Sequence, residues 1–115
     1  MDDMDPVDVE TCGENAVVAR FRLAPAGFGD PSQRATVRET GTLLAELIEQ
    51  AGVGEFDGHE FGGGEAVLYA YGPDAAALFA VMAPVLRGLP FRPARVVLRH
   101  GPAGDPAAIE QHVDL

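Results

Sequence analysis

The sequence predicts an α+β domain in which an antiparallel sheet carries two helices on one of its faces. Three observations support this prediction. Two stretches repeat apolar residues every three or four positions, as a helix with one buried face does. Other stretches alternate apolar and polar residues, as half-buried strands do. Three consecutive glycines at 62–64 separate two of the strands, which is typical of a tight hairpin.

The composition is that of one globular domain. The chain has 115 residues, of which 47% are hydrophobic and 23% charged, enough for a self-sufficient core. Its single cysteine fits a reducing compartment, and no apolar run reaches the length of a membrane span. We therefore expect a cytoplasmic protein with no membrane partner.

The negative charge is concentrated at one end. The net charge is −10, and six of the eighteen acids lie in the first fourteen residues, which contain no base. We predict an acidic, mobile N-terminal arm over residues 1–14 and a single folded domain over 15–115.

The first half of the domain is predicted to be a strand followed by a helix. Residues 16–23 alternate apolar and polar side chains. Residues 30–33 combine an N-cap aspartate, a first-turn proline and a glutamine, so a helix should run over 31–51. Gly41 lies inside it, and we interpret this glycine as a close contact with the sheet. The apolar stripe of the helix is Val37, Leu44, Leu47, Ile48 and Ala51.

The glycine turn predicts a hairpin of residues 55–61 and 65–71. A turn centred on Gly63 gives three pairs on one face: Glu55 with Tyr71, Asp57 with Tyr69, and His59 with Val67. The other set is small and aliphatic, so we assign it to the core and the polar set to the open face. A slip of one residue would exchange the two faces, and the sequence leaves that alternative open.

The second half repeats the pattern. Gly72-Pro73-Asp74 should start a second helix, with proline at its first position, and this helix should end near Gly88. A strand over 95–100 and a short terminal strand over 109–115 follow. The predicted core of the whole domain is Val17, Ala19, Phe21, Leu44, Leu47, Leu68, Leu78, Val96 and Leu98.

The predicted order is βαββαβ with one extra C-terminal strand. Two right-handed crossovers and a central hairpin give a ferredoxin-like sandwich, with the first strand between the third and fourth. The run at 54–60, the triple glycine, and Tyr71-Gly72-Pro73-Asp74 followed by Leu78-Phe79 resemble a group of small bacterial proteins without an assigned function. The resemblance covers residues 16–100, implies a stand-alone ferredoxin-like domain and carries over no catalytic residue.

The open sheet face holds the candidate binding site. Arginines of the first strand should lie between Arg95 and Arg99 on one side and tyrosines on the other, a stripe that could hold a small anion. The negative net charge argues against a nucleic-acid partner. The residues assigned to the site are Arg20, Arg22, Asp57, His59, Tyr69 and Tyr71.

Metal and acid/base chemistry receive less support. Asp57 and His59 could supply two ligands, but a metal site needs three or four, and His100 and His112 are distant in sequence. An imidazole oriented by Asp57 lacks a nucleophile beside it. The glycines precede a strand rather than a helix, so they are not a phosphate loop. We expect no catalytic residue, metal or cofactor.

Two functions remain open. The first is a non-catalytic protein-interaction or regulatory domain, with an immunity-type role as one version, that binds another protein or a second copy of itself through the open face or the adjoining edge of the second strand. The second is a small enzyme or an anion- or metal-binding protein that uses the same face. A deep pocket at the site residues would favour the second function, and a flat, charge-paired face the first.

Overall fold

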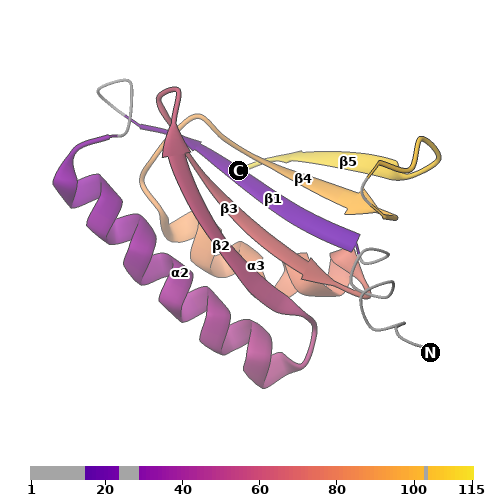
Figure 1. Ribbon diagram of the computed structural model, residues 1–115. Coiled ribbons are helices and arrows are strands. Elements are labelled where there is room, and N and C mark those ends of the chain that lie inside the picture. The colour runs from indigo at the N-terminus through magenta and orange to yellow at the C-terminus, as the bar shows by residue number, and fades with distance from the viewer. Residues whose placement is uncertain (1–14, 24–28, 103) are drawn as a thin grey trace, which may run out of the picture.

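The computed structural model describes residues 15–23, 29–102 and 104–115. The predicted arm over residues 1–14 therefore lies outside the described residues. Figure 1 shows two helices beneath one twisted sheet. The elements are β1 (Asn15–Arg22), α2 (Pro31–Ala51), β2 (Glu55–Gly62), β3 (Glu65–Gly72), α3 (Ala75–Gly88), β4 (Ala94–His100) and β5 (Ile109–Asp114).

The sheet has the predicted topology. Its strand order is β2-β3-β1-β4-β5, and every neighbouring pair is antiparallel. Both helices lie on the same side of the sheet (Figure 1), so no helix of the described residues covers the other side, which we call the open face. The chain therefore forms the ferredoxin-like α+β sandwich that the sequence predicts, with β5 added beside β4. No helix within the described parts of the chain is long and apolar enough to cross a membrane.

The core lies between the sheet and the helices. The central strand β1 contributes Val17, Ala19 and Phe21, all fully buried, and the predicted core is confirmed at every position except Leu47. Leu47 is half-buried and Ala51 is exposed. These two predictions are wrong because the buried stripe of α2 includes a glycine and follows spacings of four, three and four. Its members are Val37, Gly41, Leu44 and Ile48.

Gly41 belongs to the buried stripe of α2 because the ring of Phe56 occupies the space where its side chain would lie. A Cβ atom at Gly41 would lie 3.1 Å from Cε2 of Phe56, on β2. The missing side chain thus lets α2 approach the sheet and cover Phe56, which compensates for the low helix propensity of glycine. This contact confirms the interpretation of Gly41 from the sequence.

The helix starts are fixed by side-chain caps. Asp30 Oδ1 accepts a hydrogen bond from the Gln33 amide at 2.8 Å, and Gln33 Oε1 accepts one from the Asp30 amide at 3.0 Å, the reciprocal cap that the motif predicts. The predicted start of the second helix is two residues early. Asp74 accepts hydrogen bonds from the amides of Ala76 and Ala77, so it is the N-cap and α3 begins at Ala75.

The hairpin register departs from the prediction part-way along β2. Glu55 pairs with Tyr71 as expected, but a bulge between Phe56 and Gly58 shifts the remaining pairs by one residue. Gly58 therefore lies opposite Tyr69, and His59 lies opposite Leu68 rather than Val67. The predicted pairing of Asp57 with Tyr69 is wrong for the same reason, since the bulge makes Asp57 the extra residue.

Core packing can be tested with two neighbouring leucines of α2. Leu44 is fully buried, whereas Leu43 is 44% exposed. We expect Leu44→Ala to lower the free energy of unfolding by about 2–5 kcal/mol, because it leaves a cavity under the sheet. Leu43→Ala should change the same quantity by less than about 1 kcal/mol. Chemical denaturation followed by circular dichroism measures both, and equal losses would contradict the facing of α2.

Candidate interaction surface on the open sheet face

The open face is built by alternation along five strands. Because Val17, Ala19 and Phe21 point into the core, the intervening residues of β1 point away from the helices. The strand registers align their counterparts on β3, β4 and β5. The residues that form this open face are Val18, Arg20, Arg22, Glu65, Val67, Tyr69, Tyr71, Arg95, Val97, Arg99, Glu110, His112 and Asp114, together with Glu55 and Glu60 of β2. Asp57, at the bulge of β2, borders the same face beside Tyr69 and Tyr71.

Charge on the open face follows the strand order. The arginines lie on β1 and β4, in the middle of the sheet, while carboxylates lie on β2 and β3 to one side and on β5 to the other. On the β5 side Arg95 is aligned with Asp114 and Arg99 with Glu110. The open face is thus a basic band between two acidic margins. The edge strands β2 and β5 both carry carboxylates, so each outer edge of the sheet is acidic as well.

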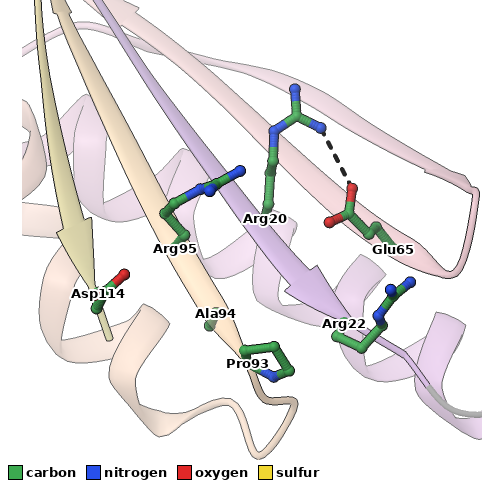
Figure 2. Close-up of a pocket in the computed structure, with 7 residues that line it drawn as sticks. All are labelled: Arg20, Arg22, Glu65, Pro93, Ala94, Arg95 and Asp114. Carbon is green, nitrogen blue, oxygen red and sulfur yellow. Dashed lines mark hydrogen bonds and ion pairs between the residues drawn. The ribbon is translucent and has the colours of Figure 1, made fainter.

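A hollow of about 240 Å³ lies at one end of the basic band. Figure 2 shows the residues that line it and the way Arg95 extends across the strands toward Arg20. Backbone hydrogen bonds hold this end of the sheet together, from the Arg22 amide to the Pro93 carbonyl at 3.0 Å and from the Leu115 amide to the Ala94 carbonyl at 3.1 Å. The lining residues are Arg20, Arg22, Glu65, Pro93, Ala94, Arg95 and Asp114.

The three arginines of the hollow are held to different degrees. Arg20 Nη1 lies 3.5 Å from Glu65 Oε1, a long ion pair between half-exposed side chains. Arg22 Nη1 donates to the carbonyls of Gly63 and Gly64 at 3.2 and 3.4 Å, which ties it to the hairpin turn. Arg95 is exposed and has no hydrogen-bond or ion-pair partner in the part of the chain that the structure describes.

The aromatic part of the open face is anchored to β2. Tyr69 Oη donates a hydrogen bond to Glu60 Oε1 at 2.7 Å. This bond, with burial and the negative charge of Glu60, raises the pKa of the Tyr69 phenol above its ordinary value, because ionisation would break the bond and bring two negative charges together. Tyr71 lies half-buried beside it, above the shallow depression that borders Asp57.

Asp57 and His59 border one depression, but the bulge gives them a different strand register from the predicted one. His59 is aligned with buried Leu68, and its ring contacts the edge of the Phe61 ring with centroids 5.1 Å apart. Phe61 in turn lies under the Arg38 guanidinium of α2, so this pair of rings is on the helix side. His59 still borders the depression beside Tyr69. Within the described residues there is no group of three His, Cys, Asp or Glu side chains suited to a metal ion.

Part of this surface was predictable from the sequence. Arg20, Arg22, Tyr69 and Tyr71 lie on the open face as predicted. The predicted site did not include Glu60, Glu65 or Asp114, which also lie on the open face. Gly58 is the signal that could have corrected the β2 register, because an isolated glycine inside a strand often marks a bulge. Its φ of 144° is one that other residues rarely adopt.

The Tyr69–Glu60 bond predicts an unusual phenol titration. The chain has two tyrosines and no tryptophan, so phenolate absorbance can be followed directly. We expect Glu60→Gln to lower the pKa of Tyr69 toward its ordinary value of 10.0, because the charge that opposes ionisation is gone. Since the folded pKa is raised, the bond stabilises the fold fully below pH 10 and this contribution is lost as the pH rises past the folded value. Tyr71→Phe is the control: it keeps the bond to Glu60, the largest cause of the shift, so the pKa of Tyr69 should stay above its ordinary value.

Comparison with known proteins assigns no family to the chain. No family model matches it, and neither a curated protein nor a solved structure matches it. The resemblance to small bacterial proteins therefore stays an expectation from the sequence. The fold and the charge pattern of the open face are the basis for the function proposed below.

Proposed function

We propose that this domain is a non-catalytic protein-interaction module whose open sheet face binds a second copy of the same chain. The observation that carries the proposal is the division of charge across the face, with carboxylates on β2 and β3 and arginines on β1 and β4. Over the four strands β2, β3, β1 and β4, and leaving out acidic β5, the surface is acidic on one half and basic on the other. Such a surface is complementary to itself under a suitable rotation.

The rotation that matches the two halves has its axis parallel to the strands. An axis that runs between β3 and β1 lays β3 of one copy over β1 of the other, and β2 over β4. Sheets that pack face to face keep their strands within about 30° of each other, so such an axis agrees with ordinary sheet packing. An axis across the strands would instead lay the arginines of β4 over those of the partner, which is repulsive.

The register along the strands supports the same arrangement. Glu60, Val67, Arg20 and Arg95 form one row across the four strands. Rotation about the strand axis brings Glu60 over the partner's Arg95. In the next row, Tyr69 and Val18 are aligned neighbours, so the same rotation lays the Tyr69 ring over the partner's Val18.

The energetics of such an interface rest on the apolar and aromatic residues in the middle of the face. Val18, Val97 and Tyr69 are half-buried in the single chain and would lose their remaining contact with water. Tyrosine and arginine are also the residue types enriched at the energetic centres of interfaces. The charged rows would fix the orientation and reject like-charged partners more than they add affinity.

The enzyme alternative has less support on this face. Asp57 and His59 border the same shallow depression, but no hydrogen bond or ion pair joins their side chains. The hollow is lined by charged residues, a proline and an alanine. A cytoplasmic location agrees with the single cysteine. The resemblance to small bacterial ferredoxin-like proteins is compatible with an interaction role.

Reversing the charge of Glu60 or of Arg95 tests whether the dimer forms and how its two copies are oriented. Glu60→Arg alone and Arg95→Glu alone each create two repulsive contacts in a homodimer, so each should raise the dimer dissociation constant about tenfold or more. Mixing the two variants restores both attractive pairs, so the mixture should form a heterodimer. Light scattering and sedimentation measure the mass of each variant and of the mixture.

Matched charge changes on the helix side serve as controls. Glu46→Arg on α2 and Arg87→Glu on α3 alter exposed positions by the same charge and should leave the dimer unaffected. A wild-type chain that remains a single copy at high micromolar concentration would sink the homodimer. If the wild type dimerises but the mixture of Glu60→Arg and Arg95→Glu chains does not, the proposed orientation of the axis is wrong.

A further inference from the structure

The arginines of the hollow are placed where they repel one another. Arg20 and Arg95 are aligned neighbours on β1 and β4 and both point from the open face. Like charges directly opposite each other on adjacent strands are destabilising. Arg22 lies two residues along β1 and lines the same hollow, so a third cation adds to the repulsion. Nothing in the packing of the core requires three guanidiniums at this end of the sheet.

The carboxylates of the hollow only partly offset this charge. Glu65 reaches Arg20 at 3.5 Å, at the long end of ion-pair distances. Asp114 is aligned with Arg95, yet no ion pair joins their side chains. Three guanidiniums and two carboxylates leave one positive charge in a concave site on a chain whose net charge is −10. The hollow is therefore a local cationic site on an anionic protein.

We propose that this hollow binds a small oxyanion, a carboxylate or phosphate group, between the guanidiniums of Arg20 and Arg95, with Arg22 at the rim. A guanidinium presents parallel N–H donors that match two oxygens of such a group, and its positive charge strengthens both hydrogen bonds. An oxyanion between the two aligned arginines would also cancel their repulsion. The ligand accounts for an arrangement that is otherwise unfavourable.

The dimensions and the margins of the hollow restrict the ligand. A cavity of about 240 Å³ is below the range of drug-sized ligand pockets, so it suits a single oxyanion group or a very small acid. The acidic margins formed by β2, β3 and β5 repel extended polyanions such as nucleic acid. Arg20 can exchange Glu65 for the ligand because their ion pair is long and its side chains are 40% and 37% exposed.

Oxyanion binding in the hollow does not require the dimer. In the dimer Arg95 would face the partner's Glu60, so an oxyanion and a partner compete for this guanidinium. Binding is therefore measured at a protein concentration at which light scattering gives a single copy. A failure to dimerise and a failure to bind oxyanion then appear in different experiments.

The test is a titration of the full chain with inorganic phosphate, with chloride removed in step so that the ionic strength stays constant. The chain contains eight arginines and no lysine, so the Nε–H signals in nitrogen-15 NMR spectra report each cationic side chain. We expect saturable shifts at Arg20, Arg22 and Arg95, and none at Arg87 on α3. A parallel titration with acetate distinguishes carboxylate from phosphate as the preferred group.

Three variants decide the assignment. Arg95→Gln should weaken phosphate binding about tenfold or more, because it removes a charge-assisted donor. Arg38→Gln, on the helix side over Phe61, is the matched control and should bind as the wild type does. Asp114→Asn removes a repelling carboxylate without removing a donor, so it should bind phosphate more tightly. Shifts that stay linear and equal at all eight arginines, or an Asp114→Asn variant that binds no better, would overturn the proposal.

Discussion

The central position of β1 is the constraint on which the rest of the structure depends. β1 pairs with strands on both sides and buries Val17, Ala19 and Phe21 completely. Since side chains alternate along a strand, that burial directs Arg20 and Arg22 to the open face. A shift of one residue would bury both guanidiniums without partners, at a cost of several kcal/mol each. The apolar face of β1 thereby decides where the cations of the domain lie.

Much of the fold could be predicted because it depends on local patterns. Strand alternation, the Asp30 cap and the glycine turn each act over a few residues, and together they specify the element order. The failures have a different physical origin. Leu47 is half-buried because Gly41 belongs to the packing stripe, and a glycine carries no hydrophobic signal. The bulge in β2 arises from pairing with β3, which periodicity within β2 alone does not contain.

In the candidate site, too, some positions follow from local patterns and others from pairing between strands. The positions of Arg20 and Tyr69 follow from alternation within their own strands, so the sequence sufficed for them. Asp114 and Glu65 take part through registers between strands that are far apart in the chain. The alignment of Arg20 with Arg95, which the oxyanion inference requires, is likewise a property of the folded sheet. Pairwise charge geometry of this kind needs the three-dimensional structure.

The irregular β2 edge has a consequence for how copies of the protein can accumulate. An exposed edge strand offers unpaired N–H and C=O groups to any extended chain, and addition there can continue without limit toward fibres. In β2 the bulge at Asp57 interrupts that ladder, and Glu55 and Glu60 add charge along it. The proposed association through the open face would, by contrast, be complete at two copies. The bulge that offsets the hairpin register thus disfavours open-ended growth at the β2 edge.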